Sequence, residues 1–244
     1  GKQRVHPSGI KSICISKGAQ ITSDAAIMAI EYEIEVLFVN NAGNPVGRIW
    51  SHKYGSVSNI RRGQLDFTLS KSAVAWIKQI IVQKIENQQA LLLSLKAPDP
   101  DQKNSVSEAI SKLADYTGKI KNLKGEIVSD IAPSLRGWEG AASRTYFSTL
   151  NMFLKPAYQF TGRKQHPATD LINCLLNYAY GILYGKIEGA LIKAGIDPYV
   201  GVFHRDDYNR PVLVFDVIEK FRVWADYVVV TLAVQEVITA DCFS

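Results

Sequence analysis

The spacing of apolar residues changes once along this chain, near residue 67, and no other feature constrains the possible folds as strongly. Before this point, short segments alternate apolar and polar side chains, which is typical of half-buried strands. After it, nearly every segment repeats apolar residues at helical spacing. We therefore predict an α+β fold, with a small N-terminal β-rich domain followed by a larger all-helical domain.

The first fifth of the chain has the pattern of a mixed β domain. Residues 10–15 alternate as a strand does, and the segment 22–30 opens with capping oxygens and continues with an apolar helical stripe. The apolar run 34–39 predicts a buried strand. After a turn-rich segment, residues 46–50 predict a strand that pairs back against it. A polar, basic connector then covers residues 51–66.

We place the domain boundary at the end of this connector, which gives an N-terminal domain over 1–66 and a helical domain over 67–244. Helical periodicity, interrupted by proline and glycine, divides the second part into five helices. They are expected over residues 69–96, 104–118, 122–150, 168–195 and 212–240.

Composition limits the class of protein. The three cysteines are far apart and form no CxxC pair, which argues against a disulfide framework or a zinc knuckle and suits a reducing cytoplasm. The apolar stretch 227–234 is too short to cross a bilayer, which takes about 20 residues. We therefore expect a cytoplasmic protein without membrane association. The formal net charge of +5 permits a polyanionic partner without requiring one.

Several sequence motifs of common enzymes do not occur in this chain. It contains no GxGxxG, no GxxxxGK[ST], no HExxH and no GxSxG pattern. These absences argue against nucleotide hydrolysis by a P-loop, zinc proteolysis and serine hydrolysis.

Glu139 is the first candidate for a functional residue. It stands between Gly137 and Gly140, where the backbone can be approached closely, and Arg136 and Arg144 are near it in sequence. Fixed cations beside a carboxylate suit a site that holds a metal and a phosphate together. The alternative is an ordinary helix with a solvated Glu–Arg pair and small residues that favour close packing.

His204 is the second candidate, because it follows an apolar pair and precedes a loop rich in charge. Imidazole is a common ligand of transition metals. The alternative is a loop histidine that bonds to Asp206 or Asp207.

Asp216 and Glu219 form the third candidate, since an i, i+3 spacing places both carboxylates on one helical face, and Arg222 continues that row. Asp216 follows four apolar residues, so it is expected near the buried side, where a carboxylate needs a partner such as a divalent cation. The alternative is a capping Asp and a surface ion pair between Glu219 and Arg222.

Together these candidates supply one imidazole and two or three carboxylates with arginines nearby, which is a plausible Mg²⁺ or Mn²⁺ site for phosphodiester chemistry. A basic loop over 160–167, with Arg163 and Lys164, suits contacts with backbone phosphates. The alternative for this loop is an ordinary polar connection between two helices.

Five motifs occur in an order that resembles a known family. They are Glu-Gly-Ala-Ala-Ser-Arg-x-Tyr-Phe (139–147), Gly-Arg-Lys-x-x-Pro (162–167), Asp-Leu-Ile-Asn-x-x-Leu-Asn-Tyr-x-Tyr (170–180), Gly-Ile-Asp-Pro-Tyr-Val-Gly-x-x-His (195–204) and Phe-Asp-Val-Ile-Glu-Lys-Phe-Arg (215–222). With segments 21–30 and 43–50 at the front, the chain resembles the CRISPR-associated adaptation integrase, CRISPR-associated protein one, over nearly its whole length.

This resemblance implies an endonuclease or integrase of spacer acquisition, with a homodimeric assembly. It implies a metal centre of Glu139, His204 and Glu219, with Asp216 as an additional carboxylate in or near the metal shell. The enzyme would join 3′-hydroxyl ends of foreign DNA to the CRISPR repeat, using Mg²⁺ or Mn²⁺ and the partner CRISPR-associated protein two. We expect phosphates to be held by four basic residues: Arg136, Arg144, Arg163 and Lys164.

Two expectations remain open beside this one. A casposon-type transposase shares the catalytic domain, and a non-catalytic scaffold would bind DNA through the basic loops alone. Family members also carry further strands before a segment like 9–17 and further helix after one like 212–240. We therefore expect the chain to be truncated at either end, or to be a piece of a larger fusion.

Overall fold

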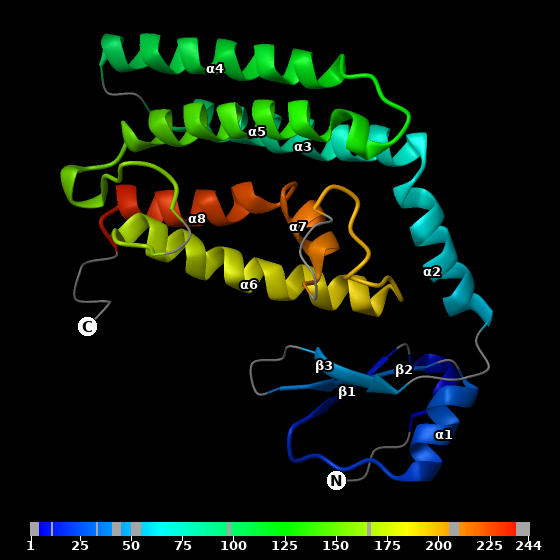
Figure 1. The fold of residues 1–244 in the computed structure, drawn as a ribbon. Coiled ribbons are helices and arrows are strands. Elements are labelled where there is room, and N and C mark those ends of the chain that lie inside the picture. The colour runs from blue at the N-terminus through cyan, green and yellow to red at the C-terminus, as the bar shows by residue number, and fades with distance from the viewer. Residues whose placement is uncertain are drawn as a thin grey trace.

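The computed structural model describes residues 5–10, 12–32, 34–40, 45–49, 55–96, 99–164, 167–204 and 210–237 of the 244-residue chain. The elements are β1 (Ser12–Ser16), α1 (Ser23–Glu31), β2 (Glu35–Val39), β3 (Pro45–Ile49), α2 (Gly55–Thr68), α3 (Lys71–Ser94), α4 (Pro100–Lys121), α5 (Val128–Asn151), α6 (Leu171–Lys193), α7 (Val212–Ile218) and α8 (Arg222–Val234), with 3-10 turns at Pro7–Gly9 and Pro156–Tyr158. A small sheet thus precedes a larger helical part, which confirms the predicted fold class (Figure 1).

The N-terminal sheet has the strand order β1-β2-β3. β1 and β2 are parallel and are joined through α1, whereas β3 runs antiparallel to β2, as the expected pairing back requires. In register, Ile13 lies opposite Val36, and Val36 lies opposite Ile49. The buried residues Ile15, Ala29 and Val36 form a small core between the sheet and α1.

Helix α2 lies within the segment that the sequence marked only as a connector. Polar contacts help to hold it against the rest of the helical part. The side-chain amide of Gln64 donates to the carbonyl of Asp197 at 3.1 Å, and its oxygen accepts from the Asp197 amide at 2.9 Å. At the other end of α2, the Phe67 ring packs edge-on against Trp76 of α3, 6.0 Å between centroids. A local sequence pattern cannot indicate these distant contacts.

Capping residues fix where the long helices begin and end. The side chain of Ser70 accepts from the amide of Ala73, and the carboxylate of Asp99 accepts from the amide of Gln102. Asp170 caps α6 in the same way. Gly195 follows α6 with a φ of 74°, a conformation that favours glycine and stops the helix. The predicted helices 69–96 and 168–195 therefore match α3 and α6 to within a few residues.

The predicted helix 212–240 consists of two helices, because α7 ends at Ile218 and α8 starts at Arg222. At the break, the amide of Lys220 donates to Val217 and that of Phe221 donates to Ile218, so the chain tightens into i+3 turns. Glu219 lies at this break and Arg222 at the start of the next helix. The chain therefore changes direction between Glu219 and Arg222, two residues that were expected on one face of a continuous helix.

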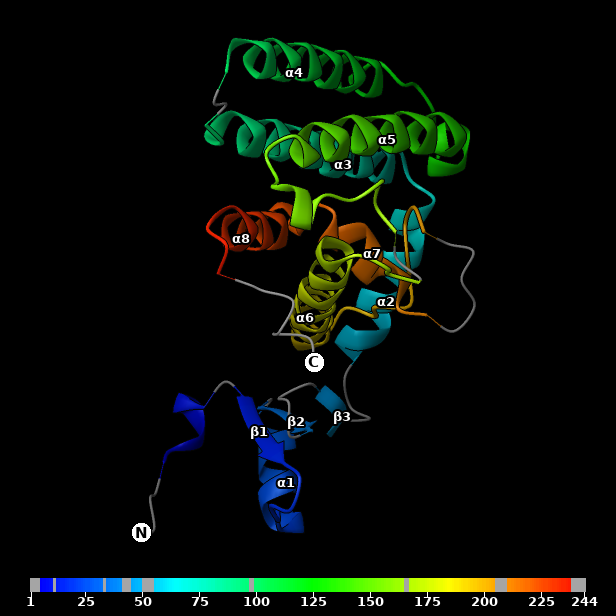
Figure 2. The ribbon, with the colours of Figure 1, turned by 90° about the vertical axis from the view of Figure 1, so that its left-hand side faces the viewer.

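Two groups of helices pack together to form the large core. α4 and α5 pack against α3 on one side, and α6 packs against α7 and α8 on the other. α3 also contacts α7 and α8, so it lies between the two groups (Figures 1 and 2). This arrangement brings the middle of α3 and α5 close to the α7–α8 break. Within the described part of the chain, every helix is too short or too polar to cross a lipid bilayer.

Candidate metal centre

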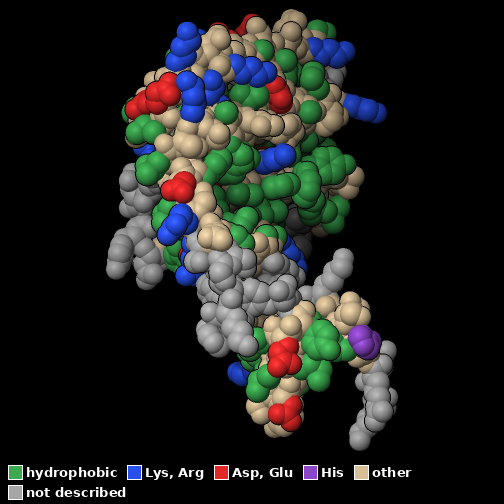
Figure 3. Space-filling view, turned by 90° about the vertical axis from the view of Figure 1, so that its right-hand side faces the viewer, with side chains coloured by type: hydrophobic (Ala, Val, Ile, Leu, Met, Phe, Trp, Pro, Cys, Tyr) green, Lys and Arg blue, Asp and Glu red, His purple; other side chains and the backbone are tan. Residues whose placement is uncertain are grey.

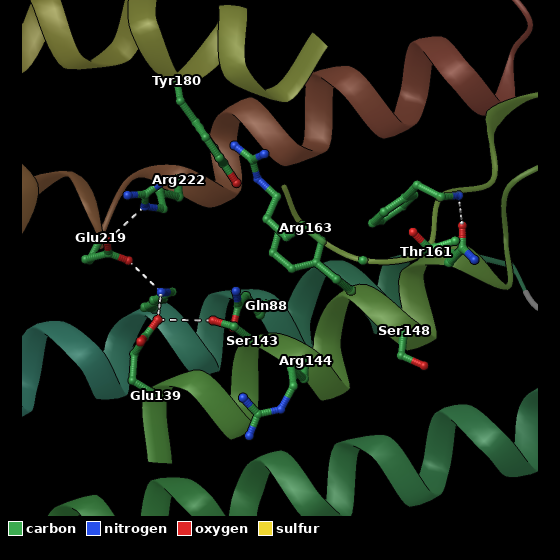
Figure 4. Close-up of a pocket in the computed structure, with 15 residues that line it drawn as sticks. Gln88, Glu139, Ser143, Arg144, Ser148, Thr161, Arg163, Tyr180, Glu219 and Arg222 are labelled. Carbon is green, nitrogen blue, oxygen red and sulfur yellow. Dashed lines mark hydrogen bonds and ion pairs between the residues drawn. The ribbon is translucent and has the colours of Figure 1, made fainter. Parts of the chain in front are cut away.

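The carboxylates of Glu139 and Glu219 meet at the ammonium group of Lys84. Nζ of Lys84 donates to Oε1 of Glu139 and lies 2.6 Å from Oε2 of Glu219. The hydroxyl of Ser143, one turn after Glu139 on α5, also donates to Oε1 at 3.1 Å. Three elements thus supply the cluster: α3, α5 and the α7–α8 break (Figure 4). Two carboxylates that are 80 positions apart in the sequence therefore share one cation.

Buried charge controls the protonation of this cluster. Only 6% of the surface of Lys84 and 6% of that of Glu219 are exposed. Burial raises the pKa of Glu219, but the cations of Lys84 and Arg222 outweigh it and lower the pKa to about 2. Burial lowers the pKa of Lys84, but Glu219 and Glu139 outweigh it and raise the pKa above its ordinary value. Both Lys84 and Glu219 are therefore charged at neutral pH.

Arg222 forms the other half of the ion pair at Glu219. Its Nε donates to Oε1 of Glu219 at 2.9 Å. The expected contact between Glu219 and Arg222 is therefore present. It is not the surface pair that the alternative required, because Glu219 is buried.

His204 is held by Asp216. Nδ1 of His204 lies 2.7 Å from Oδ1 of Asp216, which is fully buried. The Asp216 carboxylate also accepts hydrogen bonds from three consecutive backbone amides, those of Val202, Phe203 and His204. In this structure Asp216 therefore fixes the loop and the imidazole ring, and Nε2 is the ring nitrogen left for a ligand. The alternative partners, Asp206 and Asp207, lie outside the described residues.

Glu139 and Glu219 line one cavity, whereas His204 lines its neighbour. The first cavity has a volume of about 810 Å³ and also contains Lys84 and Arg144 in its wall. The second contains His204 and Tyr184. Three side chains line both cavities: Arg163, Tyr180 and Arg222. The structure thus brings Glu139 and Glu219 together and places His204, the third predicted metal ligand, at the adjoining cavity.

The residues expected to hold phosphates differ in what they contact. Arg144 is exposed and lines the first cavity. Arg163 donates to the side-chain oxygens of Asn173 at 2.9 Å and Asn177 at 2.6 Å, and it lies over the Tyr180 ring. This set of contacts fixes the basic loop 160–167 against α6.

Arg136 and Lys164 complete the set of expected phosphate contacts. The guanidinium of Arg136 lies 5.1 Å from the centre of the Phe203 ring and donates to the Phe203 carbonyl, so it supports the loop that carries His204. The Lys164 side chain is exposed, and its backbone amide bonds to Asn173.

Basic side chains elsewhere on the helical part are mixed with acidic ones. Figure 3 shows Lys and Arg side chains interspersed with Asp and Glu over the upper helical body. The pairs include Lys71–Glu126, Lys119–Asp115 and Lys121–Glu86. Exposed ion pairs of this kind contribute little to stability. Arg144, which is exposed at the first cavity, is better placed to bind a polyanion than these paired side chains.

A divalent cation fits the carboxylate pair. Oε2 of Glu219 is buried, and its partner is the Lys84 ammonium group 2.6 Å away. Two carboxylates arranged around one positive charge suit a divalent cation, because carboxylate oxygens are among its preferred ligands. Within the described ranges, no three His, Cys, Asp or Glu side chains stand close enough together to form a complete metal centre. Of the candidate ligands, Glu139 and Glu219 are the two that line the same cavity.

Sequence reasoning missed Lys84, although a signal was present. Lys84 follows the apolar residues Ile80 and Ile81 at helical spacing, so it lies on the buried face of α3. A lysine in that position needs acidic partners, because an unpaired buried charge is costly. The sequence does not say which acids those are.

A buried acid, Asp226, was also missed. Asp226 accepts hydrogen bonds from the hydroxyl groups of Tyr146, at 3.0 Å, and of Tyr180. Burial raises the pKa of Asp226 to about 6, although both tyrosines act in the opposite direction. The guanidinium of Arg222 lies 4.7 Å from the centre of the Tyr180 ring, which connects this cluster to Glu219.

Known proteins share this sequence and this fold. A sequence model described as "CRISPR associated protein Cas1" matches residues 1–244. A CRISPR-associated endonuclease Cas1 from Archaeoglobus fulgidus is 30% identical over 230 residues, which cover 90% of this chain and 66% of that relative. The chain thus spans about two thirds of the length of this curated relative.

Solved structures agree with this result. A partial Cas6-RT-Cas1–Cas2 complex superposes with a TM-score of 0.74 at 25% identity, covering 94% of this chain and 67% of the other. A casposase bound to integration product also has a TM-score of 0.74, at 21% identity, covering 95% and 66%. The second similarity is one of fold alone. The sequence match over the full chain shows that this protein belongs to the CRISPR associated protein Cas1 family.

Proposed function

We propose that this chain carries the catalytic centre of a metal-dependent DNA integrase of CRISPR adaptation. It would join the 3′-hydroxyl ends of foreign DNA fragments to the CRISPR repeat by transesterification. One observation carries the proposal: in a member of this family, Glu139 and Glu219 share a single cation at a cavity lined by three arginines. That combination suits a divalent cation beside a phosphodiester.

Glu139 and Glu219, with the Nε2 atom of His204, would hold the metal. When bound, Mg²⁺ or Mn²⁺ would supply Lewis-acid chemistry that favours the ionised 3′-oxygen and neutralises charge on the phosphoryl group. His204 lines the adjoining cavity, which shares Arg163, Tyr180 and Arg222 with the cavity of the two glutamates. We assign Asp216 to positioning His204.

Protein groups prepare the site before DNA arrives. Lys84 and Arg222 keep Glu219 ionised, so the carboxylate needs no proton loss in order to act as a ligand. Arg144 would bind a phosphate directly, since it is exposed at the cavity. Arg163 would shape the adjacent loop, because Asn173 and Asn177 hold its guanidinium group.

The test is a strand-joining reaction with 3′-hydroxyl duplex DNA, a supercoiled plasmid that bears a CRISPR repeat, and Mn²⁺. Glu139→Gln, His204→Ala and Glu219→Gln are each expected to lower product formation by at least about 100-fold, since even the partners of metal ligands cost 10- to 100-fold. Glu126→Gln is the matched control, because Glu126 is an exposed carboxylate paired with Lys71. Retained activity in all three site variants would reject the assignment.

The reaction also separates the alternative functions. A non-catalytic scaffold would bind DNA in the presence of EDTA and give no joined product with Mn²⁺. The casposase neighbour shares this fold, and a casposon-type enzyme would join its own element ends to targets without a CRISPR repeat. Comparing plasmids with and without the repeat distinguishes these two integrases.

Assembly belongs to the same proposal. A structural neighbour at 25% identity is named as a Cas1–Cas2 complex, which supports CRISPR-associated protein two as the partner. We further propose that the chain works as a homodimer in the cytoplasm, where its DNA substrates would be found.

A further inference from the structure

Lys84 occupies the position between Glu139 and Glu219 at which two carboxylates converge. Its ammonium group is a compact cation with contacts to both acids, and it lines the same cavity. Because the proposed function assigns this position to a divalent cation, the ammonium group and the metal compete for the same oxygen atoms. The following inference rests on that function.

The two acids that contact Lys84 have different surroundings. Glu219 has a second cation, because Arg222 donates to its other oxygen at 2.9 Å. Glu139 is less enclosed, with 25% of its side chain exposed. An ion can therefore approach from the Glu139 side, while Arg222 keeps Glu219 paired if the ammonium group moves away.

Stability alone is a weak reason for a lysine at this position. Removing charges from water costs several kcal/mol per ion, and apolar residues of similar volume are often as stabilising as a buried ion pair. Yet without any cation, Glu139 and Glu219 would face each other as like charges with low solvent access. A side-chain cation relieves this repulsion, and a four-methylene chain allows the charge to move without moving the backbone.

We propose that Lys84 is a placeholder cation, which holds Glu139 and Glu219 together in the metal-free protein and leaves this position when a divalent cation binds. Lys84 remains charged throughout, so the exchange substitutes one cation for another. Its displaced ammonium group would remain at the cavity that Arg144 and Arg163 also line. The apparent metal affinity would then equal the intrinsic affinity multiplied by the fraction of molecules in which the ammonium group has left this position.

Direct metal titration provides the first test. Mn²⁺ binding is measured by calorimetry on the wild-type chain, on Lys84→Met and on Lys71→Met. Methionine matches the length of lysine without its charge, and Lys71 is an exposed lysine on the same helix. We expect Lys84→Met to bind Mn²⁺ about tenfold or more tightly than the wild-type chain, and Lys71→Met to match the wild type. Equal or weaker binding by Lys84→Met would overturn the proposal.

Loss of any nearby positive charge favours a cation, so the position of Lys84 must also be observed. A crystal structure of the wild-type chain with Mn²⁺ supplies this measurement even if Lys84→Met does not fold. We expect the ion at Glu139 and Glu219, with Nζ of Lys84 no longer in contact with both carboxylates. An ion at that position with both Lys84 contacts intact would show a permanent structural lysine and reject the exchange.

A third outcome separates this proposal from the function on which it rests. If neither the wild-type chain nor Lys84→Met binds Mn²⁺ at Glu139 and Glu219, the metal centre itself is wrong and the exchange falls with it. If Mn²⁺ binds and strand joining depends on it while Lys84 stays in place, the function stands and only the exchange is rejected.

Discussion

The Nδ1 atom of His204 lies 2.7 Å from Oδ1 of Asp216, a buried carboxylate that also accepts hydrogen bonds from three consecutive backbone amides. Asp216 therefore organises the loop and the ring together. The sequence made both Asp216 and His204 candidates for the metal shell. The contact between them indicates different roles, because Asp216 orients the imidazole ring of His204.

We expect Asp216→Asn to destabilise the protein by about 3 kcal/mol, because an amide has a single oxygen for donors that now bond to a carboxylate. His204→Ala should cost less than about 1 kcal/mol, because its side chain is 39% exposed and the backbone contacts with Asp216 remain. Urea unfolding of both variants measures these changes. A similar stability loss for the two would show that the loop does not depend on Asp216.

The two carboxylates of the candidate centre should differ in their effect on stability. Glu219→Ala is expected to cost about 3 kcal/mol, since it leaves Lys84 and Arg222 buried with one acid removed. Glu139→Ala should cost about 1 kcal/mol, because Glu139 is partly exposed and Lys84 keeps Glu219. Thermal and urea unfolding of the metal-free chains provide the comparison. Equal losses would indicate that burial does not distinguish the two acids.

Acid should remove the stabilisation that Glu219 provides. Its pKa is about 2 in the folded protein against an ordinary value of 4.5, so the unfolded chain binds the proton more readily in this interval. The contribution, on the order of 3 kcal/mol, is fully present above about pH 5 and is lost as the pH falls toward 2. The free energy of unfolding of the wild type should therefore approach that of Glu219→Gln between pH 5 and pH 3. A constant difference would contradict this prediction.

Asp226 should have the opposite pH dependence. Its pKa is raised to about 6 from 3.8, so the folded protein binds the proton more readily and stability falls as pH rises through this interval. The change amounts to about 3 kcal/mol between pH 4 and pH 7. Asp226→Asn keeps an oxygen acceptor between Tyr146 and Tyr180 and has no proton to lose. The free energy of unfolding of Asp226→Asn, relative to that of the wild type, should therefore rise by this amount between pH 4 and pH 7. A constant difference would refute the raised pKa of Asp226.

Two arginines at the same cavity should affect DNA binding in different ways. Arg144→Ala is expected to weaken duplex binding at all sequences and to reduce the salt slope by about one, with little change in stability. Arg163→Ala should lower thermal stability as well, because Asn173 and Asn177 lose their donor. Fluorescence anisotropy at several salt concentrations, together with thermal unfolding, distinguishes them. Lys103→Ala, on α4 and away from this cavity, is the matched control.

The fold class and the approximate positions of most helices followed from local sequence patterns. Apolar periodicity and capping residues such as Ser70, Asp99 and Asp170 act over a few residues, so a single chain reveals them. The motifs around Glu139 and Glu219 indicated the family, because each motif is a short run of residues that can be read directly from the chain. Helix α2 was not recognised in this way, and Gln64 holds it through hydrogen bonds to Asp197, 133 positions further along the chain.

Which charged side chains meet depends on how the helices pack against one another. Lys84, Glu139 and Glu219 are far apart in sequence and come together because α3 packs against α5 on one side and against α7 and α8 on the other. The same packing brings the side chain of His204 into contact with Asp216, at a cavity that adjoins the one lined by Glu139 and Glu219. Electrostatic pairing depends on distance and burial in space, and neither quantity is written in the spacing of residues along a chain.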